Sequence, residues 1–488
     1  MKRRSSERRA TAAAATSSCS QHQQKRHDNS NTGAWEENTM AILDSSGIKD
    51  SRDVQDDQLC FLEAVRSASL ASDPPLAPSW RILNAIFQIL VDCNSLELMM
   101  ASYQLLIDLD KHYPRMYLSR SDNPESSSSD VSKIVVFEEA WSPFNFELGG
   151  EEGTSMDSCL FDSLRFSNLI EDIVETVNKS NVDLVIKPVG NLLVFQYLIN
   201  VLEEDLSLRL TLYKETSNWL LLRESVLNIL LGSRKLNFKS LVRDCMSILL
   251  KQCHHNILNN SQLLRTSEDT CIQSNQDSVV ALATAFSELE KKTFIAVQIF
   301  LKLIMEFDVV RKQADSLGLT SRLDSFRLPI LDIIVDELTY DKDSLPQFLM
   351  AFSDPKWKLE LILQYFSKYL TKSSVRTRRS NDTQNDETLK GILSNFSTAT
   401  KTKNTVKKVS SEAAQLLLTH AFQACLCLVH GPKQIASTIE RTGATLPVIC
   451  NSLISAFRNL REVDEDLEIT SFAKEALFTA ATVLRRKC

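Results

Sequence analysis

Glycine and proline are scarce in this chain. Only 11 glycines and 12 prolines occur among 488 residues, whereas average usage would give about 58 of the two together. Tight β-turns depend on these residues, because glycine adopts positive φ angles and proline presets the turn. A protein of this length built from β-sheets would need dozens of them. The shortage therefore predicts an almost wholly helical chain whose helices are joined by polar loops.

Long apolar runs and secretory features are also lacking. The longest approach to a membrane-spanning run, Phe294 to Met305, is interrupted by Gln298 and Lys302, so we expect no membrane-spanning helix and no membrane partner. The first forty residues have no apolar core of the kind that a secretory signal needs. The 11 cysteines show no repeated spacing, which favours reduced, buried thiols in the cytosol or nucleus over a disulfide framework.

Motifs that support catalysis are missing as well. We find no phosphate-binding loop, no dinucleotide-binding glycine fingerprint, no HExxH and no GxSxG. His420 and His430 have no cysteine or serine partner at a suggestive position. Cys425 and Cys427 diverge on a helix and do not form a ligand pair. We therefore expect a partner-binding protein that is not an enzyme and holds no cofactor.

One cluster of potential metal ligands stands out. Cys253, His254 and His255 are consecutive, and Cys245 precedes them by about two helical turns. Structural zinc needs four ligands in tetrahedral reach, usually as two short pairs, and a second pair is absent. Buried thiols beside a helix end are therefore favoured, and a metal-dependent protein that uses Cys245, Cys253 and His254 is the less favoured alternative.

Apolar residues recur at the spacing of an amphipathic helix. A stripe at positions 0, 3, 4, 7, 10 and 11 occurs in Leu96–Ile107, Phe238–Leu249, Leu359–Leu370, Ala414–Cys425 and Ala473–Leu484. Shorter versions between these segments bring the expected number of helices to about a dozen or more, which fits stacked hairpins better than a four-helix bundle. Because no clean repeat of about 40 residues is visible, we predict an irregular α-solenoid of armadillo/HEAT-like helical hairpins.

Composition divides the chain into six parts. They are a disordered basic tail (1–38), an N-terminal helical array (39–253), a flexible insertion (254–277), a central helical array (278–371), a basic loop (372–408) and C-terminal helices (409–488). We expect further polar loops at Ser119–Asp130 and Gly149–Ser158, and a helix break at Pro74 to Pro78.

The basic tail has three interpretations. Residues 1–34 carry seven basic and two acidic residues among many Ser, Ala and Gln, and such a segment cannot bury enough apolar surface to order itself. It resembles an organelle transit peptide, or a weak nuclear-import signal built on Lys2, Arg3 and Arg4. A solvated tail without an address is favoured on composition alone.

The basic loop 372–408 has nine basic residues against three acidic ones, and only Leu389 to Phe396 suggests a short helix. Its candidate contacts with a partner or with DNA are Arg376, Arg378, Arg379, Lys401, Lys403, Lys407 and Lys408. These cations could neutralise phosphates, although aromatic residues for base stacking are missing. A solvated linker, or a docking arm for an acidic partner, is favoured over direct DNA binding. The arginines also fit a nuclear-import patch.

Seven strings of the sequence resemble a plant protein family, the negative regulators of systemic acquired resistance. They are Lys49–Asp53, Glu139–Phe146, Asn218–Ser225, Ser233–Lys239, Asp336–Asp341, Asp354–Glu360 and Val375–Arg379. They occur in order and cover nearly the whole chain from about residue 40, whereas the basic tail is peculiar to this sequence.

The resemblance implies a nuclear, armadillo/HEAT-like protein without catalytic residues. It further implies a regulatory subunit of the structural-maintenance-of-chromosomes five-six complex, paired with an Nse-five-like partner. Such a subunit would act in homologous-recombination repair and in repression of pathogenesis-related genes, where transcription factors are also candidate partners. A direct DNA-binding repressor that acts through residues 372–408 is the alternative.

Overall fold

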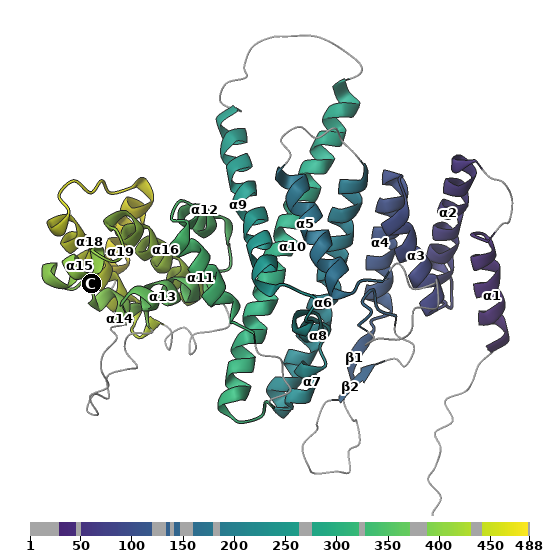
Figure 1. The fold of residues 1–488 in the computed structure, drawn as a ribbon, viewed down its shortest axis with the longest axis horizontal. Helices are drawn as coiled ribbons and strands as arrows, with labels where there is room; N and C mark the ends of the chain where they lie inside the picture. The colour runs from purple at the N-terminus through teal and green to yellow at the C-terminus, as the bar shows by residue number, and fades with distance from the viewer. Residues whose placement is uncertain are drawn as a thin grey trace, which may run out of the picture. The chain divides into compact units, whose positions relative to one another are not determined.

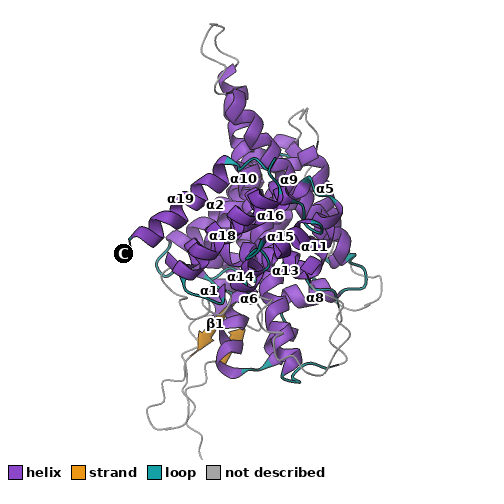
Figure 2. Cartoon of the chain, turned by 90° about the vertical axis from the view of Figure 1, so that its left-hand side faces the viewer, coloured by secondary structure: helices purple, strands orange, loops and turns teal. Residues whose placement is uncertain are grey.

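The structure, a computed structural model, describes residues 29–44, 50–119, 133–136, 141–146, 160–178, 186–262, 276–321, 327–370, 388–430 and 442–486. This part of the chain is all-α apart from one short β-ribbon (Figures 1 and 2). The fold class predicted from the scarcity of glycine and proline is therefore confirmed. The chain separates into two compact units, residues 1–78 and 79–488.

The first unit contains α1 (Asn29–Ala41), α2 (Ser51–Arg66) and a short π-helix, η1 (Ser67–Ala71), that continues α2. α1 packs against α2, and the Thr39 hydroxyl donates to the Trp35 carbonyl oxygen (2.8 Å). The prediction of a disordered tail up to residue 38 is therefore wrong for residues 29–38. Half-buried Trp35 and Met40, which follow directly on the polar residues 1–34, supply the apolar surface that lets α1 pack.

The second unit carries the other helices of the described residues. They are α3 (Trp80–Asp92), α4 (Leu96–His112), α5 (Ser163–Asn178), α6 (Ile186–Thr216), α7 (Trp219–Arg223), α8 (Val226–Gly232), α9 (Phe238–Gln262), α10 (Gln276–Ser316), α11 (Ile330–Tyr340), α12 (Ser344–Ala351), α13 (Pro355–Leu370), α14 (Leu389–Ser394), α15 (Ala399–Val406), α16 (Ser411–His430), α18 (Leu446–Val463) and α19 (Ser471–Arg485). The five long apolar stripes fall in α4, α9, α13, α16 and α19, as predicted. The prolines at 74, 75 and 78 lie between η1 and α3, also as predicted.

The β-ribbon was not expected from the sequence. β1 (Met116–Ser119) and β2 (Lys133–Val136) pair antiparallel, with Met116 opposite Val136, and both contact α6. Strands of four residues are too short to show a clear alternation of apolar and polar side chains, although β2 is rich in β-branched residues. Ser119, placed in a predicted loop, belongs to β1, and the rest of that loop lies outside the described residues, as does Gly149–Ser158.

α6 is the central helix of the second unit. It packs against α3, α4, α5, α7, α8, α10 and the ribbon. From Leu192 to Leu202 all side chains except that of Asn200 are buried, so this stretch is covered on all sides, as expected of a helix inside a core. Aromatic rings continue the core outward, with Phe87 in edge contact with Trp141 (5.4 Å between centroids).

Two long helices extend into the predicted insertion at 254–277. α9 runs to Gln262 and α10 begins at Gln276, so the prediction of a structureless insertion is wrong for both flanks. Once a helix is nucleated, each added residue gains a hydrogen bond and extends the helix at little cost in free energy. The polar ends of α9 and α10 can therefore continue beyond the apolar stripes that packing requires.

The C-terminal helices form successive layers. α13 packs against α11 and α16, and α16 packs against α18 and α19, which also contact each other. One helix of the described chain, α16, is long and apolar enough to cross a membrane by length and composition, and 56% of its most apolar window is buried inside the protein. The core helix of a soluble protein passes the same test, so this finding is weak evidence for a membrane span.

Candidate interaction surfaces

The C-terminal half of the predicted basic loop is folded. α14 and α15 occupy residues 389–406, each begun by a threonine cap: the Gly391 amide donates to the Thr388 hydroxyl (3.1 Å) and the Lys401 amide to Thr398 (3.3 Å). The prediction of a loop over 372–408 is therefore wrong for residues 389–406, apart from the short helix expected near Leu389. α15 escaped notice because its inner face carries buried Thr402 and Thr405 in place of leucines.

This segment is fixed to its neighbours. Phe396 is fully buried and meets Phe366 of α13 edge-on (6.0 Å between centroids). The Asn459 amide of α18 donates to the Phe396 carbonyl oxygen (2.7 Å), and the Thr405 hydroxyl donates to the carbonyl oxygens of Lys401 (3.1 Å) and Asn395 (3.4 Å). Inward-facing hydroxyls and aromatic packing thus leave the lysines on the outside.

The lysines of this segment are all exposed, and we call them the lysine surface. It comprises Lys390, Lys401, Lys403, Lys407 and Lys408. Within the described part of the chain none of the five forms an ion pair with a carboxylate; Lys401 Nζ donates only to the Ser394 carbonyl oxygen (3.5 Å). The structure therefore places four of the predicted contact residues at exposed positions on α15 and directly after it. Arg376, Arg378 and Arg379 lie outside the described residues, as do Lys2, Arg3 and Arg4.

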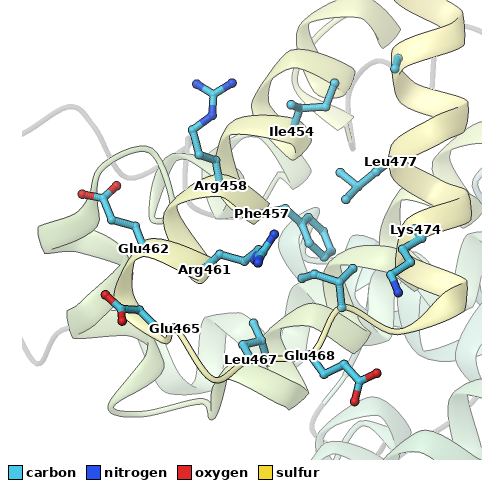
Figure 3. Close-up of a pocket in the computed structure, with 12 residues that line it drawn as sticks. Ile454, Phe457, Arg458, Arg461, Glu462, Glu465, Leu467, Glu468, Lys474 and Leu477 are labelled. Atoms are coloured by element: carbon cyan, nitrogen blue, oxygen red, sulfur yellow. The ribbon is translucent and has the colours of Figure 1, made fainter.

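A groove opens between α18 and α19 (Figure 3). Its volume is about 1080 Å³. Phe457 and Leu467 form a buried apolar floor, which half-buried Ile454, Leu477 and Ala481 extend. Arg458, Arg461 and Lys474 also border it. The groove is open, apolar at its base and charged at its edge.

One end of this groove is acidic. The last turn of α18 and the connection to α19, hereafter together the acidic turn, contain Glu462, Asp464, Glu465, Asp466 and Glu468. None of these carboxylates forms an ion pair in the part of the chain that the structure describes. We did not single out this turn from the sequence, although five acidic residues within seven were a visible signal.

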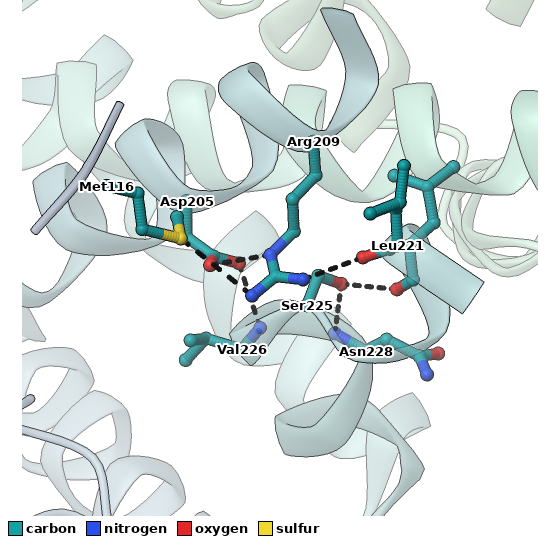
Figure 4. A network of polar contacts seen from close by, with 8 residues as sticks. Met116, Asp205, Arg209, Leu221, Ser225, Val226 and Asn228 are labelled. Atoms are coloured by element: carbon teal, nitrogen blue, oxygen red, sulfur yellow. Dashed lines mark hydrogen bonds and ion pairs between the residues drawn. The ribbon is translucent and has the colours of Figure 1, made fainter. Parts of the chain in front are cut away.

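Charges in the middle of the chain are arranged differently (Figure 4). Arg209 Nε donates to Asp205 (2.8 Å) and Arg209 Nη1 donates to the Leu221 carbonyl oxygen (2.9 Å). The second carboxylate oxygen of Asp205 accepts the Val226 amide (2.9 Å). Both side chains are at least 87% buried, and together they join α6 to α7 and α8.

Two further buried ion pairs also direct their charges at protein groups and away from solvent. Arg115 donates to Asp110 (3.0 Å) and to the Tyr197 hydroxyl (2.8 Å), beside a cavity of about 790 Å³. Arg327 pairs with Asp308 (2.6 Å), whose carboxylate also accepts the Ile330 amide. Burial raises the pKa of Asp308, and Arg327 opposes this shift. These pairs hold helices together, because their polar atoms are directed at one another.

Of the candidate ligands and histidines singled out from the sequence, the structure describes the side chains of Cys245 and His420 inside the core. No group of three or more His, Cys, Asp or Glu side chains suited to a metal occurs among the described residues. Cys245 is fully buried, and burial raises the pKa of its thiol; the side chains of Cys253 and His254 lie outside the described part. Burial, with the nearby Lys358, lowers the pKa of His420 to about 4. His420 therefore stays neutral against the ring of Phe472 (4.8 Å).

Comparison with known proteins identifies the family. Residues 115–354 match the SNI1 middle domain and residues 370–488 match the SNI1 C-terminal domain. The chain is 40% identical over 457 residues to the Arabidopsis thaliana protein "Negative regulator of systemic acquired resistance SNI1", covering 93% of this chain and 95% of that protein. No solved structure matches. The middle-domain match runs from Arg115 through α12, and the C-terminal match includes both the lysine surface and the groove. The chain therefore belongs to the SNI1 family of negative regulators of systemic acquired resistance.

Proposed function

We propose that this protein is a non-catalytic nuclear scaffold that restrains defence-gene expression and takes part in homologous-recombination repair. In this role it is a regulatory subunit of the structural-maintenance-of-chromosomes five-six complex, paired with an Nse-five-like subunit. The observation that carries the proposal is the 40% identity to a negative regulator of systemic acquired resistance across nearly the full length of both chains. A helical array supports it physically, because preformed ridges and grooves bind partners without the cost of ordering a flexible segment.

Complementation tests the regulatory part. The full chain is expressed in an Arabidopsis thaliana line that lacks the relative, and transcripts of pathogenesis-related genes are measured without infection. We expect them to fall to the level of the unaltered plant. Transcripts that stay raised, although the protein accumulates, would contradict the regulatory role.

Affinity purification tests the complex. The tagged chain is purified from nuclei after nuclease treatment and its partners are identified by mass spectrometry. We expect core subunits of the five-six complex and an Nse-five-like protein in stoichiometric amounts. Their absence from a preparation that retains the folded chain would overturn the subunit assignment.

Direct DNA binding is the second candidate, and the lysine surface favours it. Every exposed residue from Ser394 to Ser410 is Lys, Ser, Thr or Asn, and these are the side chains that contact phosphates without reading bases. Binding of duplex DNA would then weaken steeply with salt. Replacing Lys401, Lys403, Lys407 and Lys408 by glutamine should reduce the slope of log affinity against log salt by about 3 to 4. An unchanged slope would remove this candidate.

A further inference from the structure

We infer that the groove between α18 and α19 is a docking site for a basic amphipathic helix of a partner protein. This inference rests on the scaffold role proposed above and specifies the kind of partner that one surface takes. The groove has the shape and chemistry for an α-helix, because its apolar floor lies between two helices and has charged borders (Figure 3).

Exposed apolar surface adjoins the groove on α19. Phe478 is 74% exposed, and helical periodicity places it beside two lining residues, Lys474 at i−4 and Ala481 at i+3. Large aromatic side chains contribute most to binding when a partner buries them. Phe478 therefore extends the apolar floor to the outer edge of α19, which one apolar helix face would cover together with Leu477.

The acidic turn favours a positively charged partner. Glu462 and Asp464 lie at the C-terminal end of α18, where the helix dipole is negative and favours cations. Three more carboxylates, Glu465, Asp466 and Glu468, follow without an ion pair among the described residues. In the groove itself Glu462, Glu465 and Glu468 stand against Arg458, Arg461 and Lys474. Asp464 and Asp466, which belong to the turn and lie outside the lining, give the turn and its surroundings an excess of two negative charges. A helix with lysines or arginines at the end that meets the turn would satisfy it.

The test uses a dye-labelled peptide of about 18 residues, roughly five helical turns, with leucines on one face and lysines on the other. Its binding to the full chain is followed by fluorescence anisotropy. Two control peptides are a scrambled sequence of the same composition and a version with glutamate in place of lysine. We expect the lysine peptide to bind and both controls to bind at least about tenfold more weakly.

Matched variants locate the binding. Replacing the acidic turn (Glu462→Lys, Glu465→Lys, Glu468→Lys) should weaken the lysine peptide by at least about tenfold, as should Ala481→Glu in the floor. Phe478→Ala should weaken it by about three- to tenfold. The controls should bind as the unaltered chain does: Tyr340→Ala removes an aromatic side chain that is 92% exposed on α11, and Asp53→Lys, Asp56→Lys and Glu63→Lys reverse exposed charges on α2. Circular dichroism establishes that each variant is folded.

Three results would overturn the inference. One is equal binding of the lysine peptide to the unaltered chain and to folded Ala481→Glu. Another is equal binding of the scrambled peptide, which would show attraction to charge alone. The third is a dimer seen by light scattering that Phe478→Ala abolishes, because a second copy would then occupy the groove. None of these depends on the co-purification experiment, so a failed groove leaves the proposed subunit role standing.

Discussion

Charges serve opposite purposes in the middle and in the C-terminal part of the second unit. In the middle, Arg209 and Asp205 are buried and directed at each other and at backbone groups. In the C-terminal part, the lysine surface and all of the acidic turn except half-buried Asp464 are exposed, and none of these charges has an ion pair among the described residues. Buried pairs fix geometry, since removing one partner leaves the other uncompensated. Exposed single charges add little to stability and are free to meet a partner.

Removing a buried charge should have the largest effect. Asp205→Ala leaves Arg209 without its carboxylate and the Val226 amide without its acceptor, so we expect a loss of about 3 to 5 kcal/mol in the free energy of unfolding. Urea denaturation measures it. Glu203→Ala, two residues away and half-buried, is the control and should change the value by less than about 0.5 kcal/mol. Equal losses in the two variants would refute the contrast between buried pairs and unpaired charges.

Lowering the pH should destabilise the core of the C-terminal part, because His420 is buried there. Its pKa is lowered to about 4 in the folded chain by burial and by Lys358, so the unfolded chain binds the proton first as pH falls. Neutral His420 therefore contributes fully to the free energy of unfolding above about pH 6.5. As pH falls toward 4, this free energy decreases by about 3 kcal/mol.

Urea midpoints between about pH 4.5 and about pH 7.5 test this dependence. His420→Leu should flatten the profile in that window, because the side chain that takes up the proton is gone. His430→Gln, at an exposed position of the same helix, should leave the profile as it is. A profile that His420→Leu does not alter would show that another group controls it.

Substitutions at two glycines test how tightly the C-terminal part and the middle of the second unit are packed. Both Gly443 and Gly318 have positive φ angles, 68° and 70°, which cost an alanine about 1 kcal/mol or more. A Cβ at Gly443 would also lie 2.6 Å from Thr388 Oγ1, whereas a Cβ at Gly318 would meet nothing. We expect Gly443→Ala to destabilise the protein by about 2 to 4 kcal/mol and Gly318→Ala by about 1 kcal/mol. Similar losses would mean that the Thr388 cap of α14 yields easily.

The lysine surface should show the smallest effect on stability. Replacing Lys401, Lys403, Lys407 and Lys408 by glutamine removes no ion pair, so the urea midpoint should stay that of the unaltered chain. Asp205→Ala serves as the opposite case in the same measurement. A clear fall of the midpoint would indicate that these side chains support the fold, and that the exposed charges are not held free for a partner.

The sequence predicted those features that depend on neighbours along the chain. Stripes such as Leu96–Ile107 identify helices because residues three and four apart share a helix face. α15 was missed because Thr402 and Thr405 are not recognised as an apolar stripe, and the β-ribbon because each strand has only four residues. Arg209 and Asp205 have a helical i,i+4 spacing that the sequence displays. The contacts that tie such charges to other elements were beyond reach, because Arg115 and Tyr197, for example, are 82 residues apart and only folding brings them together.

The candidate site was predicted in part. Four of its lysines were identified from a run that has nine basic residues against three acidic ones, and the folded chain presents them on one short segment. The groove could not be seen in this way, because a concave surface needs the crossing of α18 and α19. Its acidic end was visible, however, and a search for unbalanced charge of either sign would have found it.

α18 is shared by the two surfaces. It contacts α14 and α15 as well as α19, and its Asn459 side chain donates a hydrogen bond to the Phe396 carbonyl oxygen. Deleting α19, from Ser471 onward, would thus expose the faces of α16 and α18 that it covers. Such a deletion would disturb the lysine surface as well as the groove. Deletion mapping of partners would attribute every loss to the missing end, so only single-residue changes can tell which surface a partner recognises.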